Sequence, residues 1–122
     1  MLSFIFIQLS RLPIKTLYVI STILSFTLNH IVKYRKAAVY RNLNKSFPEL
    51  NEREIKQIAN GFYNYLADIS IETIKLYRLS EKELENRVVF ENPEILKKYQ
   101  SNNRGVFIMM GHSGNWEWAG AI

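Results

Sequence analysis

The first 33 residues carry most of the continuous apolar sequence in this 122-residue chain. They contain a short apolar run, LSFIFIQL, and then seventeen uncharged residues between Lys15 and Lys33. A straight membrane-spanning helix needs about 20 mainly apolar residues, and about 17 is the lower limit. The second run reaches that limit only by including polar side chains, among them Thr16, Asn29 and His30. We therefore expect residues 1–33 to form a membrane-associated apolar helix, which either spans the bilayer or lies in its interface.

Charge is distributed as unevenly as hydropathy. Residues 1–45 contain seven basic residues and no acid, whereas residues 46–122 contain nine basic and eleven acidic residues; these charges of +7 and −2 give the net +5. Such asymmetry indicates an anionic partner, and a membrane surface attracts each basic residue by about 1 kcal/mol. A cleaved signal peptide and a buried core helix are the alternatives for the apolar segment. Nucleic acid is not an expected partner, because the basic residues form no recognised binding motif.

From residue 34 onward the pattern becomes helical. Residues 34–46 mix apolar and basic side chains, which predicts a short basic helix that ends before Pro48. Asn51 and Glu54 then form a capping box, which opens an amphipathic helix running to about Tyr77. Its apolar positions recur at steps of three and four residues, so we expect them to face the core: Ile55, Ile58, Phe62, Tyr65, Leu66, Ile69 and Thr73.

Two further features of this helix have a structural and a functional interpretation. The aromatic stripe Phe62, Tyr63 and Tyr65 indicates core packing rather than a ligand cage. Asp68 and Glu72 lie one turn apart, as an acid/base pair would, but a solvated helix face is the expected role.

The last third of the chain predicts short helices and strands. Ser80 and Glu83 form a second capping box, and Pro93 opens another short helix that ends near Gln100. Two apolar runs, residues 88–90 and 106–110, are expected as strands; the second, which follows Gly105 in GVFIMM, is of the kind that is buried on both faces. The expected fold class is therefore α/β, with an N-terminal membrane-associated helix and a helical layer leading into the first strands of a sheet.

Candidate chemistry lies where the second expected strand ends. The sequence GHSGN leads into WEWAGAI, which predicts a strand, a tight turn and a helix, with the turn at the edge of the sheet where ligands bind. His112 can act there as a general base, Glu117 can orient its imidazole, and free amides at the helix start can stabilise an oxyanion. On spacing alone, a histidine that only satisfies the turn is an equally good interpretation. The absence of cysteine and the presence of only two histidines argue against a metal site, and no cofactor is expected.

The block from His112 to Glu117 resembles the H-x4-D/E acyltransferases, specifically the branch that acylates lipid A precursors in Gram-negative bacteria. That branch carries H-x-G-N-W-E, matched here by HSGNWE, and upstream segments are similar too: RNL (41–43), FPEL (47–50), LYRLS (76–80) and V-x-x-E-N (88–92). The resemblance covers essentially the whole chain, and it implies the glycerolipid-acyltransferase type of α/β sheet.

The resemblance also implies a reaction and its partners. A fatty acyl group would pass from an acyl carrier protein thioester to a hydroxyl of a lipid A precursor or similar membrane glycolipid, at the cytoplasmic face of the bacterial inner membrane. His112 would be the general base and Glu117 its orienting group, while Gly114 and Asn115 would shape the turn and Trp116 would pack beside the substrate site. Acylation of a lysophospholipid or an aminolipid, or a membrane-bound remnant without catalysis, are the alternative functions.

The chain is also expected to be incomplete. The helix that begins at Asn115 reaches Ile122 without a cap, and the expected strands lack most of the sheet needed to bury them. The family is longer and includes an arginine-containing acceptor motif that is not present here. We therefore expect residues 34–122 to be the N-terminal part of an acyltransferase domain that is inactive and poorly folded alone.

Overall fold

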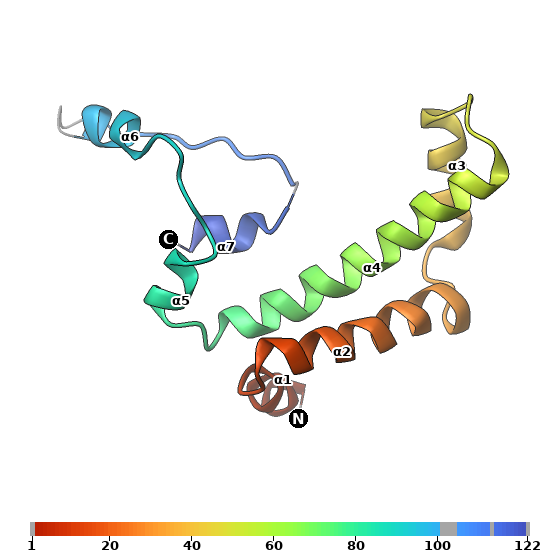
Figure 1. Cartoon of the computed structure of the whole chain (residues 1–122), viewed down its shortest axis with the longest axis horizontal. Helices are drawn as coiled ribbons and strands as arrows, with labels where there is room; N and C mark the ends of the chain where they lie inside the picture. Colours follow the sequence, from red (N-terminus) through yellow and green to blue (C-terminus); the bar gives the residue numbers. More distant parts are fainter. Residues whose placement is uncertain (1, 101–104, 113, 122) are drawn as a thin grey trace. The chain divides into compact units, whose positions relative to one another are not determined.

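The computed structural model describes residues 2–100, 105–112 and 114–121 (Figure 1). The chain divides into two compact units, of which the first ends at Tyr77 and the second begins at Arg78. Each unit is described separately below.

The described residues of the first unit form helices joined by short turns. It comprises α1 (Leu2–Ser10), α2 (Ile14–Phe26), the π-helical turn η1 (Thr27–Ile31), α3 (Lys36–Ser46) and α4 (Glu52–Leu76). The described part of the apolar segment, residues 2–33, thus forms α1, α2 and η1 rather than one helix, because Pro13 cannot donate a backbone hydrogen bond and separates α1 from α2. None of the described helices combines the length and the apolar character that crossing a membrane requires.

Helix α4 begins and extends as its sequence predicts. The Asn51 side chain accepts hydrogen bonds from the amides of Arg53 and Glu54, and the Glu54 carboxylate accepts one from the Asn51 amide, so the capping box is complete. The basic helix α3 is also confirmed, and it is followed by the turn that contains Pro48.

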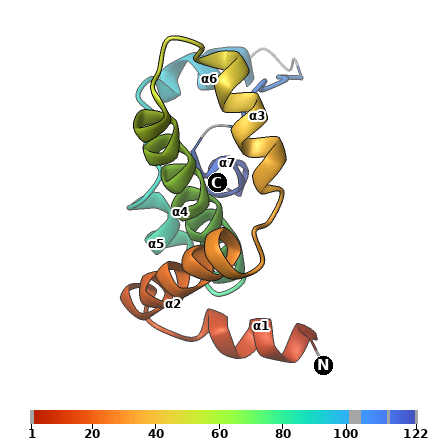
Figure 2. The ribbon, with the colours of Figure 1, turned by 90° about the vertical axis from the view of Figure 1, so that its right-hand side faces the viewer.

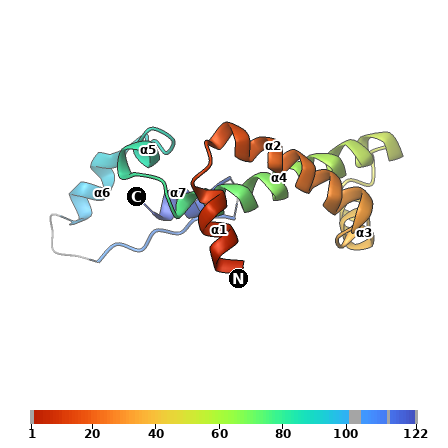
Figure 3. The same cartoon turned by 90° about the horizontal axis from the view of Figure 1, so that it is seen from below.

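Four polar side-chain pairs join α2 and η1 to α4, and we call them the polar ladder. Tyr18 donates to Glu72, Ser21 to Asp68, Ser25 to Asn64 and Asn29 to Asn60. The partners run in opposite directions along the chain, so α2 and α4 are antiparallel, and Figures 1 and 3 show them side by side. The solvated face expected for Asp68 and Glu72 is correct only in part: both carboxylates accept hydrogen bonds from α2, and the Ser21–Asp68 pair is partly buried, whereas the Tyr18–Glu72 pair is exposed.

The buried face of α4 differs from the expected one. Five residues at four-residue steps are buried: Ile55, Ala59, Tyr63, Ala67 and Ile71. Of the positions expected to face the core, Ile55 is buried, whereas Phe62 and Tyr65 are 38% and 44% exposed and Ile58 and Thr73 are also exposed. Ala59 and Ala67, between the larger buried residues of this face, allow the two helix backbones to approach closely enough for short polar side chains to pair.

Most large side chains of α2 point outward, with Leu17 as the buried exception. Ser21 and Ser25 are buried on the inner face of α2 and Asn29 is buried in η1, while Val19 and Ile23 of α2 are each 63% exposed. Figure 2 shows α1 lying below α2 and joined to its start by a short connection. The Lys75 ammonium donates to the carbonyls of Ser10 and Leu12 at 3.1 and 3.0 Å, which satisfies acceptors that the end of α1 leaves free.

The second unit contains α5 (Glu81–Glu85), α6 (Pro93–Gln100) and α7 (Trp116–Gly120). The Ser80–Glu83 capping box and the helix that starts at Pro93 are confirmed. The α/β fold class is wrong for the described residues, which contain no strand: residues 88–90 and 105–110 have no ladder partner. A strand exists only when a neighbouring strand accepts and donates its backbone hydrogen bonds, and the apolar character of a run cannot supply that neighbour.

The polar ladder predicts that removing one partner is costly. Ser21→Ala leaves the partly buried Asp68 carboxylate without its hydroxyl donor, so we expect the free energy of unfolding to fall by about 1–3 kcal/mol. The control is Thr22→Ala, because the exposed Thr22 hydroxyl donates its hydrogen bond to the Tyr18 carbonyl of the same helix. This substitution should change the free energy of unfolding by less than about 0.5 kcal/mol. Urea denaturation measures both, and equal losses would contradict the role of the ladder.

Tyr63 predicts a pH dependence of stability. Burial raises the pKa of its hydroxyl above the ordinary value of 10.0, and neighbouring Tyr40 raises that pKa further. The stabilisation is fully present below about pH 10 and is lost as pH rises through the folded-state pKa, because the unfolded chain releases this proton first. Wild-type protein should therefore lose stability between about pH 8 and about pH 11 more steeply than Tyr63→Phe, as measured by urea denaturation. Identical pH profiles would contradict this assignment.

Candidate active site

An extended segment leads into the candidate site. Residues 105–110 carry apolar side chains, and Phe107 and Met109 are 99% and 96% exposed. The sheet edge expected to present His112 is therefore not formed by the described residues, and His112 follows this extended segment in an exposed position.

The turn after His112 depends on a glycine. Gly114 has φ of +68°, a left-handed conformation that glycine adopts without the steric cost that a Cβ atom brings. Ser113 lies outside the described residues. Asn115 ends the turn as the N-cap of α7, and its side-chain oxygen accepts a hydrogen bond of 3.1 Å from the Trp118 amide. That amide is thus occupied and does not serve the oxyanion expected at the helix start.

The imidazole of His112 contacts an aromatic ring. The His112 and Trp116 rings meet edge to face, with centroids 4.9 Å apart and planes at 64°. This packing restricts the imidazole without enclosing it, because both residues remain exposed. A proton-accepting nitrogen beside a partly exposed aromatic surface is an arrangement that can receive an amphipathic substrate.

Glu117 lies one position beyond Trp116, in the first turn of α7, where an acidic side chain is favoured by the helix dipole. Among the described residues, no hydrogen bond joins its carboxylate to His112. The structure therefore brings His112 and Trp116 into contact and holds Gly114 and Asn115 in the turn, whereas Glu117 is near in sequence without being bonded to the imidazole.

Trp118 is a residue of this region that the sequence analysis did not identify. It is 6% exposed, and the Arg87 guanidinium lies 5.4 Å from its ring centroid. Trp116 and Trp118 are two positions apart, so they cannot share one helix face. This spacing in the sequence predicts that one of the two tryptophans packs inward. The inward tryptophan fixes α7, and the other one is then left beside His112.

Comparison with known proteins identifies the family. The family model described as bacterial lipid A biosynthesis acyltransferase matches residues 2–122, which confirms the resemblance drawn from the HSGNWE block and the upstream segments. No curated protein and no solved structure gives a match. Since the matched region is nearly the entire chain, this protein belongs to the bacterial lipid A biosynthesis acyltransferase family.

Proposed function

We propose that this protein acts in transferring a fatty acyl group from an acyl carrier protein thioester to a hydroxyl of a lipid A precursor, with His112 as the general base. One observation carries the proposal: in a chain of this family, an exposed histidine ends an extended segment and contacts the first residue of the helix that carries Glu117. The acceptor supplies the nucleophile, so no serine or cysteine nucleophile is needed. A lysophospholipid or an aminolipid remains the alternative acceptor.

The proposed step needs one proton acceptor and one proton donor. His112 removes the proton from the acceptor hydroxyl as the oxygen attacks the thioester carbonyl carbon. The carbon–sulfur bond then breaks, the ester is formed, and the imidazolium returns its proton to the departing thiolate sulfur. In this scheme His112 is the only protein group that has to gain and lose a proton, which passes from the acceptor hydroxyl to the departing sulfur.

Glu117 and the turn residues have supporting roles in the proposal. A carboxylate that accepts the second imidazole N–H selects the tautomer and stabilises the imidazolium, and this bond can form when substrate binds. Gly114 and Asn115 keep the turn short, and Trp116 limits the orientations of the imidazole while offering an apolar surface to the substrate.

The catalytic proposal predicts distinct effects for the two histidines. His112→Ala should lower acyl transfer by at least about 100-fold, because the hydroxyl then has no proton acceptor. His30→Ala is the control: its exposed ring stacks on Phe26 in the first unit, and acyl transfer should stay within about twofold of wild type. Glu117→Gln should lower turnover by at least about 10-fold with little change in affinity for the acceptor.

The assay follows labelled acyl groups from acyl carrier protein to a lipid A precursor, a lysophospholipid and an aminolipid. It is run on the 122-residue chain and in parallel on the longest polypeptide that its gene encodes. Transfer to a different acceptor would identify the substrate. Full activity of His112→Ala, or no transfer to any acceptor, would exclude His112 catalysis and favour a non-catalytic membrane role.

We further propose that α1 and α2 attach the protein to the cytoplasmic face of the inner membrane by lying in the interface. The outward residues of α2 form an apolar surface, with Val19, Ile23 and Phe26 all more than half exposed. A surface of this kind, beside a segment with seven basic residues and no acid, has the amphipathic character of an interfacial helix.

This attachment predicts that one outward side chain of α2 matters for vesicle binding. Ile23→Asp should reduce flotation with phosphatidylcholine vesicles that contain phosphatidylglycerol by about tenfold, since it places a charge in the apolar surface. Ile95→Asp on α6 is the matched control, because Ile95 is similarly exposed in the second unit, and it should float as wild type does. Equal flotation of both variants would contradict interfacial binding through α2.

A further inference from the structure

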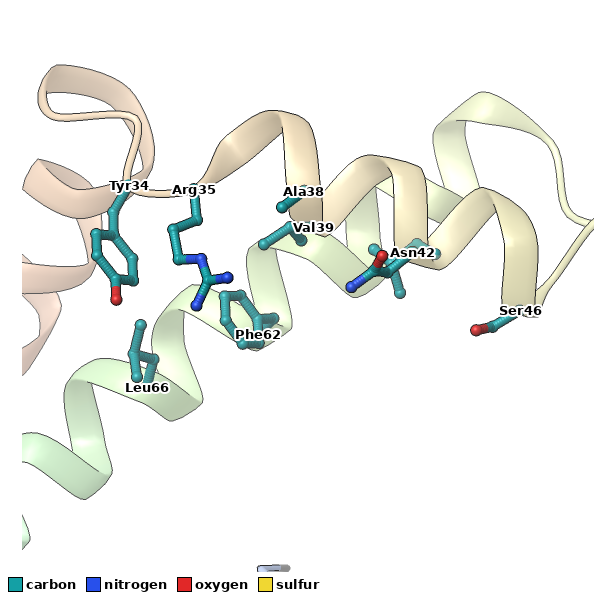
Figure 4. A pocket seen from close by; sticks show the side chains of 9 residues that line it. Tyr34, Arg35, Ala38, Val39, Asn42, Ser46, Phe62 and Leu66 are labelled. Atoms are coloured by element: carbon teal, nitrogen blue, oxygen red, sulfur yellow. The ribbon is translucent and has the colours of Figure 1, made fainter.

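A groove lies between α3 and α4 in the first unit. Its volume is about 490 Å³, within the usual range for small-molecule sites. Val39 and Leu43 from α3 and Phe62 and Leu66 from α4 form apolar walls, and Arg35 lines one end. Figure 4 shows the Arg35 side chain extending from the start of α3 toward Phe62. The groove therefore combines an apolar channel with a cation.

The backbone conformation that aims Arg35 into the groove is a strained one. Lys33 and Arg35 have φ of 51° and 48°, and they are the described residues other than glycine with positive φ. Tyr34 lies between them and is fixed from both sides: its carbonyl accepts a 2.9 Å bond from the buried Tyr63 hydroxyl, and its amide donates a 2.8 Å bond to Leu28. Strain that the surrounding structure maintains in this way is concentrated at ligand-binding segments.

The groove lacks a protein anion for this cation. Its lining residues include no aspartate or glutamate, and the first 45 residues of the chain contain none. No ion pair to Arg35 is formed within the part of the chain that the structure describes. The other polar groups at the groove are neutral: the Tyr34 side chain lies beside Arg35, whereas the Asn42 amide and the Ser46 hydroxyl lie farther along α3 (Figure 4).

We propose that this groove binds one anionic phospholipid of the membrane. Its acyl chain lies along the apolar walls, and its phosphate accepts paired hydrogen bonds from the planar Arg35 guanidinium. The apolar walls alone would accept any hydrocarbon, whereas the unneutralised guanidinium selects a ligand that ends in an anion. This is a binding site without a chemical step, and it does not depend on catalysis by His112.

The test uses a lipid that stays monomeric, so that the groove is separated from general attachment to a bilayer. Dihexanoylphosphatidylglycerol below its micelle concentration is titrated into the 122-residue chain by calorimetry, with dihexanoylphosphatidylcholine and inorganic phosphate as the other probes. We expect saturable binding of the phosphatidylglycerol and at least about tenfold weaker binding of the other two, because each lacks the net anionic headgroup or the acyl chains.

Two pairs of variants assign the binding to the groove. Arg35→Gln should weaken phosphatidylglycerol binding by about tenfold, whereas Lys36→Gln, which removes the same charge one residue away, should stay within about twofold. Ala38→Phe fills the groove and should abolish binding, whereas Ala37→Phe on the exposed side of α3 should not. Circular dichroism of each variant establishes that its helices are retained.

Several results would overturn the proposal. Wild-type protein that does not bind phosphatidylglycerol would do so, as would inorganic phosphate that binds as tightly as the lipid. Equal weakening of phosphatidylglycerol binding by the Arg35 and Lys36 substitutions would do so too. Dimerisation that Ala38→Phe removes, in the absence of lipid binding, would instead assign the groove to a second copy of the chain.

Discussion

The polar ladder between α2 and α4 is the constraint on which the first unit depends. Its four pairs recur about once per helical turn, so they fix both the pairing and the register of the two helices. A slip of one residue would move the serines and Asn29 away from their partners and leave buried polar groups unpaired, which is costly. Because serine, asparagine and alanine side chains occupy much of the interface, several bulky apolar residues point elsewhere, among them Val19 and Ile23 of α2 and Phe62 of α4.

The ladder also determines where the chain must reverse. Since α2 and α4 are paired along their lengths, the segment from η1 to α3 has to turn beside α4, and it does so through Lys33, Tyr34 and Arg35. Two positive φ angles in three residues are tolerated because the Tyr63 hydroxyl, on the buried face of α4, donates a hydrogen bond to the Tyr34 carbonyl, and the Tyr34 amide donates one to the Leu28 carbonyl. The same reversal directs Arg35 toward the groove, so helix pairing and the proposed lipid site have one structural cause.

Features encoded by neighbouring residues were predictable from the sequence. The capping boxes at Asn51 and Ser80 depend on side chains three residues apart, and both formed. Which face of α4 is buried was not predictable, because Phe62 and Ala59 both fit a helical period and only the serines of α2 decide between them. The prediction of strands was wrong for a similar reason, since strand pairing requires a partner that is distant in the sequence.

At the candidate site, the motif identified His112 and its neighbours, but the contact between His112 and Trp116 depends on Trp118 facing inward.

The polarity of the helix pair bears directly on the proposed membrane attachment. A pair of helices adapted to water buries its large apolar side chains and exposes its serines and asparagines, whereas α2 does the opposite with Ile23 and Ser25. Such an arrangement is favourable only if something apolar covers the outer face, and hydrogen-bonded polar pairs between closely packed helices are typical of association in lipid. Another protein surface can also cover an apolar face, but it gives no reason for seven basic residues without an acid in the same segment. An anionic bilayer accounts for both features, which is why we assign the outer face of α2 to the membrane in the proposed attachment.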